Sequence, residues 1–249
     1  GKAYKVNYHF NEAIGYFKLA SEKKKTSEDN SKLIPRLIEE CNNAKELLAD
    51  TTRVKPKLEN IGAPINTEAD EYVPLILSDE SLLIYTYKGK KSKGGLQNIY
   101  GEPDPDGTYY EDIFVSYKKN GSWQEPNDLG SKINSKYHDA SIAVSNNGRM
   151  VFIYKDIRGG DIFITKKEKN TWTKPEPLEG DVNTKYFEGH ASISLDGQSL
   201  YFVSDRPGGI GGTDIYKANL QSDGSWGEVI NLGPTINSVY NEDAPFVHT

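Results

Sequence analysis

The chain has 249 residues, enough for one large domain or two smaller ones, and its 23 glycines, 16 tyrosines and mean hydropathy of −0.67 are typical of short strands joined by turns under a polar exterior. No apolar run approaches the roughly 20 residues of a membrane-spanning helix, so we expect no spanning segment. The net charge is −6, with −10 carried by residues 58–249, which argues against nucleic acid as a partner because neutralising phosphates requires a basic surface.

Residues 1–52 are predicted to be helical. Apolar side chains at positions 10, 13, 14, 17 and 20 share one face at a 3.6-residue period, which predicts a helix within residues 3–20, with Asn11 as a cap where a preceding helix ends. A polar loop over residues 23–31 leads to a second helix, Leu33–Leu48, with Pro35 in its first turn. The single cysteine, Cys41, lies on the apolar face of this helix and is interpreted as a small buried hydrophobe.

Residues 53–249 are predicted to form a second domain, in which a four-strand unit recurs about every 50 residues. Its landmarks are an Asp-Ile-aromatic triplet beginning at Asp112, Asp161 and Asp214, and tryptophans at positions 123, 172 and 226, spaced by 49 to 54 residues. Each unit follows the order strand, tight turn, strand, variable loop, strand, turn, strand, which describes an antiparallel meander. Radial repetition of such units predicts a β-propeller, so the fold class is mainly β with a small α part.

Three full blades and part of a fourth are expected. In blade one the strands lie near residues 72–77, 82–87, 112–117 and 123–125. Blade two spans residues 141–175, and blade three is built on LYFV (200–203) and DIYKA (214–218). The blades differ most in the loop between the second and third strands, which is a long insertion over residues 89–111 in blade one, IRGG in blade two and PGGIGG in blade three. Loops of this kind often carry binding specificity.

The segment before blade one resembles the end of every later repeat. LENIGAPIN (58–66) matches NDLGSKIN, PLEGDVN and NLGPTIN, each of which joins the outer strand of one blade to the next blade. Residues 54–62 are therefore predicted to be the ring-closing outer strand of the last blade. The fourth repeat begins at Asn237 and stops after its first strand, so we expect the propeller to be incomplete here; closure with a second copy is the alternative.

The stretch SDRPGGIGGTDIY (204–216), repeated in weaker form at the 50-residue period, resembles the TolB-type, WD40-like propeller repeat. With helices in front, it is similar to cell-envelope proteins of Bacteroidetes-type bacteria that join tetratricopeptide helices to such a propeller and often end in an OmpA-like peptidoglycan-binding domain. The resemblance implies that residues 1–52 are a tetratricopeptide-like pair, that the location is the periplasm or the outer membrane, and that the partners are envelope proteins. Peptidoglycan would be bound only through a C-terminal domain missing from this sequence.

No catalytic or cofactor motif is present. The sequence has no Gly-x-Ser-x-Gly elbow, no Gly-x-Gly-x-x-Gly opening a helix and no P-loop. The four histidines are dispersed, without metal-ligand spacing. We therefore expect a protein that is not an enzyme and needs no cofactor.

The blade-one insertion offers candidate ligands for a metal. Asp104, Asp106 and Asp112 supply oxygen atoms on or beside a flexible loop, which suits Ca²⁺. The spacing does not match an EF-hand, and ordinary turn chemistry is the competing interpretation. Asp112 and its counterparts Asp161 and Asp214 are also expected to accept hydrogen bonds from the glycine-rich turn before them.

Candidate partner-binding residues are Tyr109 and Tyr110 on the insertion, with His138 and His190 in the same region of successive blades. Acids lie beside both histidines, Asp139 in blade two and Glu188 in blade three. One interpretation is that these acids cap turns at the start of each blade, and the other is that they line a ligand or metal site in the central channel.

The sequence is compatible with three classes of function. The first is a non-catalytic protein-interaction scaffold of the bacterial envelope, in which kinship suggests a secretion or gliding apparatus. The second is a carbohydrate- or metal-binding propeller that uses the blade-one loop and the channel. The third is a hydrolase whose catalytic module lies outside this sequence.

Overall fold

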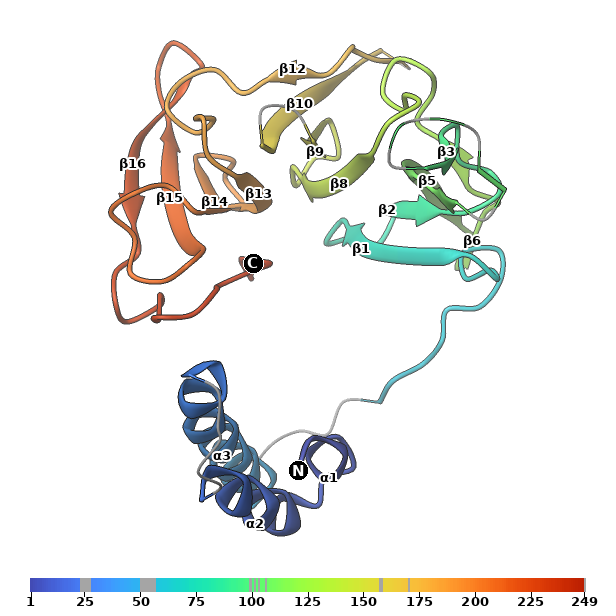
Figure 1. Cartoon of the computed structure of the whole chain (residues 1–249). Coiled ribbons are helices and arrows are strands. Elements are labelled where there is room, and N and C mark those ends of the chain that lie inside the picture. Colours follow the sequence, from blue (N-terminus) through green and yellow to red (C-terminus); the bar gives the residue numbers. More distant parts are fainter. Residues whose placement is uncertain are drawn as a thin grey trace. The chain divides into compact units, whose positions relative to one another are not determined.

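The structure is a computed structural model that describes residues 1–22, 28–49, 57–98, 100, 102, 104–105, 107–156, 159–169 and 171–248. The chain divides into two compact units, Gly1–Glu59 and Asn60–Thr249. The first is helical and the second is made of antiparallel sheets (Figure 1). The predicted domain boundary at 52/53 falls within residues 50–56, which lie outside the described residues. The helices of the described chain include none that is long and apolar enough to cross a membrane.

The helical unit is held together by one small core. Helix α1 covers Lys2–Val6, α2 covers Phe10–Ser21 and α3 covers Glu28–Ala49. Phe10, Ala13 and Phe17 of α2 pack against the apolar side of α3. Cys41 is fully buried in this core, and burial raises the pKa of its thiol, so the side chain acts as an apolar filler.

Three predictions about the helices were wrong in detail. His9, not Asn11, precedes α2, and no side chain caps its first turn. Helix α3 begins at Glu28, well before the expected Leu33, so Pro35 lies inside the helix. The missing N–H of Pro35 leaves the carbonyl of Ser31 without its helical donor, a cost that burial of the following apolar turns offsets. The lysines at positions 23–25 lie outside the described residues.

Three sheets of the second unit are the predicted blades. In blade one, β1 (Asp70–Ile76), β2 (Leu82–Lys88) and β5 (Glu111–Lys119) are followed by the outer pieces β6 (Ser122–Trp123) and β7 (Asn127–Asp128). Blade two has β8 (Asp139–Val144), β9 (Met150–Lys155), β10 (Asp161–Glu168), β11 (Thr171–Trp172) and β12 (Glu176–Pro177). Blade three has β13 (Glu188–Ile193), β14 (Ser199–Ser204), β15 (Asp214–Leu220) and β16 (Trp226–Asn231).

All pairings within the blades are antiparallel and join neighbouring strands, as a meander requires. Between β13 and β14 the predicted hairpin turn is present, with Gly197 at φ 73°. The blade-one insertion forms a small hairpin of its own, β3 (Gly95–Gln97) with β4 (Thr108–Tyr109). Figure 1 shows the three blades arranged around a common centre, with β1, β8 and β13 innermost.

The outer strand is broken in blades one and two and continuous in blade three. Pro126 and Pro175 lie between the two outer pieces, whereas Val229 holds this position in β16. Proline has no N–H to donate to the ladder, so pairing stops there. A buried hydroxyl of the third strand compensates, because Ser116 and Thr165 donate to outer-strand carbonyls at 2.6 and 2.7 Å.

The cores lie between the blades. Ile84 and Ile113 of blade one meet Val151 and Ile153 of blade two, and Phe152 of blade two belongs to the cluster that includes blade three. Leu200, Phe202 and Trp226 form the blade-three side of that cluster. Blade one is also buried on its other face, where Leu83, Tyr85, Tyr87 and Phe114 cluster with Ile65. Burial on both faces explains why β2 reads as a nearly continuous apolar run.

Two segments that were expected to hold strands form none over the residues that are described. Residues 57–62 form no strand, and residues 54–56 lie outside the described residues, so the ring-closing pairing stays a prediction. Residues 241–248 of the fourth repeat also form no strand. A strand forms only where a neighbouring strand supplies hydrogen bonds, and among the described residues neither segment has one.

Candidate functional site

Each blade begins with the same capped turn, which we call the opening turn: Thr67–Glu71, Ser135–Asp139, Thr184–Glu188 and Ser238–Glu242. In blade two the amide and hydroxyl of Ser135 donate to Asp139 at 2.6 and 2.7 Å. In blade three Thr184 makes the same pair of bonds to Glu188 at 2.8 and 2.7 Å. Asp139 and Glu188 thus cap turns, as the first interpretation of these acids predicts.

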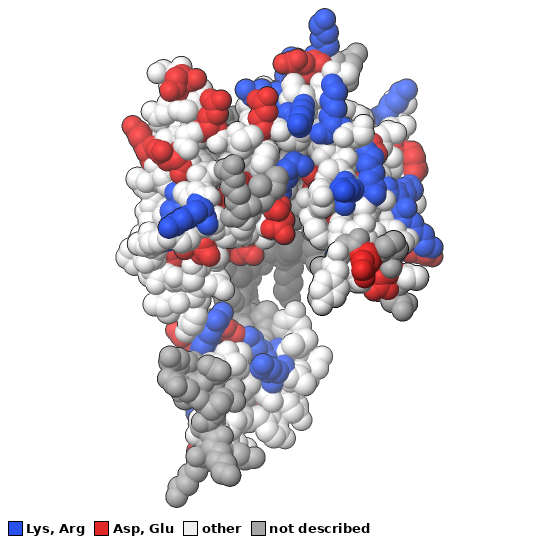
Figure 2. Space-filling view, turned by 45° about the horizontal axis from the view of Figure 1, so that its top comes forward, with Lys and Arg blue, Asp and Glu red and all other residues white. Residues whose placement is uncertain are grey.

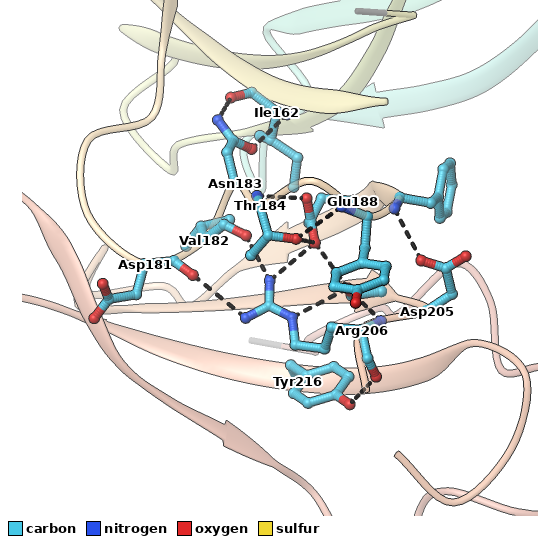
Figure 3. Close-up of polar contacts among 12 residues, drawn as sticks. Ile162, Asp181, Val182, Asn183, Thr184, Glu188, Asp205, Arg206 and Tyr216 are labelled. Atoms are coloured by element: carbon cyan, nitrogen blue, oxygen red, sulfur yellow. Dashed lines mark hydrogen bonds and ion pairs between the residues drawn. The ribbon is translucent and has the colours of Figure 1, made fainter. Parts of the chain in front are cut away.

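A cation satisfies the buried acid of blade three. Arg206 donates from Nη2 to Glu188 at 3.1 Å and to the carbonyl of Val182, and from Nη1 to the carbonyl of Asp181 (Figure 3). Its guanidinium lies 5.0 and 5.1 Å from the ring centres of Phe202 and Tyr216. In blade two Lys155 pairs with Asp139 in the same way. The arginine of SDRPGG therefore stabilises the fold, because its guanidinium donates to groups of the protein itself.

The glycine-rich loop of blade three is organised by Asp214. The amides of Ile210 and Gly211 donate to its carboxylate at 2.5 and 3.0 Å, and Asn231 donates from its side chain at 2.7 Å. Burial alone raises the pKa of Asp214, but these donors outweigh it and the net pKa lies below its usual range. The loop amides are thus engaged, as expected for turn chemistry.

An asparagine clamp that sequence reasoning missed joins each blade to the next. Asn134 accepts from the amide of Ile113 and donates to its carbonyl, both at 2.9 Å. Asn183 holds Ile162 in the same two-bond arrangement (Figure 3). Asn237 holds Ile215 in this way as well. The signal was present, since each asparagine ends the motif that closes a repeat, but spacing alone does not reveal its partner.

Blade one carries a polar cluster beside its insertion. Glu111 accepts from Lys88 at 3.2 Å and contacts His138, and the His138 ring lies 4.1 Å from the Tyr110 ring. Tyr72 also bonds Glu111, and both burial and that carboxylate raise the pKa of the phenol. For Glu111 itself, burial raises the pKa, yet the bonds from His138 and Tyr72 outweigh it and lower the net pKa.

The structure brings some of the predicted partner-binding residues together and separates others. Tyr110 and His138 are in ring contact, and Tyr109 is adjacent in β4. His190 belongs elsewhere, because it lies in β13 two residues after the capping acid, at φ 35°, and pairs with Asp243. His138 precedes its capping acid by one residue, so the two histidines do not occupy equivalent positions.

The calcium site predicted from Asp104, Asp106 and Asp112 stays a prediction, because the structure describes only two of its three residues. Among the described residues no group of three or more His, Cys, Asp or Glu is placed to hold a metal, and Asp106 lies outside those residues. Asp104 sits in the insertion, whereas Asp112 is fully buried at the start of β5. Its Oδ2 accepts from the amide of Lys93 at 3.0 Å, its Oδ1 has no hydrogen-bond partner among the described residues, and burial raises its pKa to about 6.

The inner strands enclose an apolar cavity of about 490 Å³. It is lined mainly by aliphatic side chains of β1, β8 and β13 and by residues 244–248, with His190 at its edge. The capping acids Asp139 and Glu188 are not among the lining residues. This cavity is therefore not the ligand or metal site lined by Asp139 and Glu188 that the second interpretation of these acids predicts.

Comparisons with known proteins gave structural matches only. No protein-family model matches the sequence, and no curated protein matches it. Similar solved structures include TolB from Acinetobacter baumannii (15% identity, 68% of this chain and 34% of that one, TM-score 0.42) and a putative TolB from Agrobacterium tumefaciens (18%, 68% and 47%, 0.43). The propeller domain of the Trilobed protease from Pyrococcus furiosus is a third (12%, 67% and 43%, 0.41).

The chain spans between about a third and a half of the length of these structures. At such identities a likeness concerns the fold alone. The assignment of this unit as propeller blades rests on its own strand pairing and on the repeated corners described above.

Proposed function

We propose that this chain is a non-catalytic protein-interaction scaffold of the bacterial cell envelope. The observation that carries the proposal is the Tyr110–His138 ring pair beside Glu111, which joins the loop in which the blades differ most to the opening turn of blade two. The repeated polar residues are used within the fold, whereas His138 remains 40% exposed and nearby Tyr137 is 62% exposed. Aromatic rings with a polar edge are the side chains that protein interfaces favour.

The surface charge agrees with a protein partner. On the face seen in Figure 2, acidic and basic side chains are interspersed over the sheets. A binding surface for nucleic acid instead requires a continuous basic stripe. The envelope location, in the periplasm or at the outer membrane, is inferred from the TolB-type repeat and remains part of the proposal.

The finer proposal is a component of a secretion or gliding apparatus. It rests on the combination of a tetratricopeptide-like helical unit with a TolB-type propeller, in which both parts bind envelope proteins. Peptidoglycan enters this proposal only through an OmpA-like domain outside the 249 residues of this chain.

Affinity capture from envelope extracts, followed by mass spectrometry, tests the proposal. The wild-type chain is compared with a Tyr110→Ala/His138→Ala double variant and with Tyr117→Ala, which removes a half-exposed ring at the outer end of β5 as a matched control. We expect a stoichiometric set of envelope proteins with the wild type and the control, and its loss with the double variant. If the double variant captures the same set of proteins, the ring pair is not part of the interface.

A carbohydrate ligand is the second candidate, because a partly exposed ring pair also offers a stacking platform for sugars. A glycan array and a calcium titration, each followed by thermal unfolding, separate the two candidates. Saturable sugar or Ca²⁺ binding that depends on Tyr110 would favour the ligand-binding propeller over the scaffold.

A further inference from the structure

The corner before blade one is already folded into the form that joins the other blades. The amide of Gly62 donates to Asn60 at 2.6 Å, the amide of Asn66 donates to the carbonyl of Gly62 at 3.0 Å, and the Asn66 side chain donates to Asn60 at 2.8 Å. After blade three, Asn231, Gly233 and Asn237 make the same three bonds at 2.8, 2.8 and 2.9 Å. The corner Asn60–Asn66 therefore matches a blade-joining corner bond for bond.

What differs is the strand that each corner holds. Asn134 and Asn237 are 1% and 2% exposed because each clamps an isoleucine of the preceding blade's third strand. Asn66 is exposed, and its hydrogen bond to a described side chain goes only to Asn60. Ile61 is 51% exposed, whereas its counterpart Leu129 is 7% exposed. The first corner thus presents a clamp and an apolar side chain without the strand that covers them elsewhere.

A hollow lies next to this clamp. It is lined by residues of the first opening turn and the adjoining strands: Asn66, Ala69, Asp70, Glu71, Tyr72 and Lys88. At two of the later opening turns a glycine of the preceding loop lies directly against a backbone carbonyl of the turn. A Cβ on Gly94 would lie 2.4 Å from the carbonyl oxygen of Lys136, and one on Gly211 would lie 1.9 Å from that of Tyr240. An occupant of the hollow is therefore expected to approach the first opening turn closely through a glycine.

We propose that Asn60–Asn66, with the adjoining hollow, is a docking site for the third strand of a further blade of this repeat. The docking segment carries a glycine in its loop, followed by an Asp-Ile-aromatic strand whose isoleucine offers its N–H and C=O to Asn66. The three clamps inside this chain supply the template for this interface. A second copy is a poor occupant, because its third strands are already held by Asn134, Asn183 and Asn237.

The test uses the 249-residue chain and a labelled synthetic peptide with the sequence of residues 209–220, followed by fluorescence anisotropy. We expect saturable binding that Asn66→Ala weakens about tenfold or more, because two hydrogen bonds of ~1 kcal/mol each are lost. A peptide N-methylated at Ile215, which removes the N–H that the clamp accepts, should be weakened similarly. Asn127→Ala, an exposed asparagine in the corresponding outer strand of blade one, is the control and should bind as the wild type does.

Three outcomes would overturn the proposal. The first is no saturable binding of the peptide, and the second is equal binding by wild type and Asn66→Ala. The third is a concentration-dependent dimer of the chain alone that Asn66→Ala abolishes, because this would make a second copy the occupant. Circular dichroism of Asn66→Ala confirms that the variant is folded. None of these outcomes depends on whether envelope proteins bind the blade-one ring pair, so this proposal and the proposed function fail separately.

Discussion

Single polar residues hold the blades together at the residue scale. The corners before blades two and three each combine an asparagine, an acid and a cation, and the second of them shows the set in Asn183, Glu188 and Arg206. Glu188 is fully buried and Arg206 nearly so, so the pair is favourable only while all of its bonds are made.

Arg206→Ala should be strongly destabilising. The substitution leaves the buried Glu188 carboxylate without its cation and removes the donors to two backbone carbonyls, so we expect a loss of about 3–5 kcal/mol in the free energy of unfolding. Arg206→Lys keeps the charge but not the planar fork and should fall in between. Urea unfolding followed by tryptophan fluorescence measures both, and a loss below about 1 kcal/mol for Arg206→Ala would contradict the structural role of this corner.

Blade one has an aspartate, Asp128, at the position where blade three has Asn231. Asn231 donates to Asp214, but its counterpart is Asp128, which offers no donor to Asp112 unless protonated. Burial raises the pKa of Asp112 from 3.8 to about 6, with the charges of Asp139 and Asp128 adding to the effect. Its contribution to stability is therefore complete below about pH 4 and is lost as the pH rises through 6.

Asp128→Asn should stabilise the protein at neutral pH. The new amide donates to Asp112, lowers its pKa and adds about 1 kcal/mol at pH 8, with little change at pH 4, even though the Lys93–Asp128 ion pair of 3.1 Å is lost. Unfolding free energies at both pH values measure the difference. The reverse change, Asn231→Asp, should destabilise blade three at pH 8, and stabilisation by both variants would refute the argument.

At the scale of elements, the outer strands show how a sheet edge is managed. Pro126 and Pro175 interrupt the edge in blades one and two, and the hydroxyls of Ser116 and Thr165 replace part of the lost pairing. Blade three has Val229 and Ala218 at the corresponding positions, and its outer strand β16 is continuous. An interrupted edge offers a poorer template for pairing with another chain.

Replacing both prolines should promote association without unfolding. In the Pro126→Val/Pro175→Val variant the outer strands gain amide donors, so we expect an unfolding free energy within about 1 kcal/mol of the wild type but faster aggregation. Light scattering at high protein concentration, with Val229→Ala as a control, measures this. Unchanged scattering would show that the prolines do not protect the edge.

At the scale of the whole molecule, the apolar clusters fall into two separate groups, one in each unit. The helical core of α2 and α3 shares no residue with the clusters between the blades, and Trp123, Trp172 and Trp226 all belong to the second unit. Helical and tryptophan signals therefore report on different parts of the chain.

Ala13→Leu should unfold the helical unit selectively. Ala13 is fully buried between the helices, and a larger side chain there costs about 1–3 kcal/mol through overpacking. We expect the circular dichroism signal at 222 nm to melt earlier while tryptophan fluorescence melts as in the wild type; Ala3→Leu, at an exposed site of α1, is the control. A shared shift of both signals would show that the units unfold together.

The periodic features of this protein could be predicted from its amino-acid sequence. The 50-residue period, the Asp-Ile-aromatic triplets and the turn glycines predict the blades and their antiparallel order, because local turn chemistry and side-chain alternation act over neighbouring residues. The apolar stripes likewise predict α2 and α3, although the start of α3 was placed too late because helix ends depend on weak capping preferences.

Which distant residues meet is settled only when the sheets pack. Three contacts join residues that are neighbours only in the folded chain. They are the clamp of Asn134 on Ile113, the bond from Arg206 to Glu188, and the ring contact of His138 with Tyr110. The burial of Asp112 has the same origin, since it follows from β5 lying between two other strands. Periodicity fixes where a strand forms, whereas packing between blades fixes what its polar side chains contact.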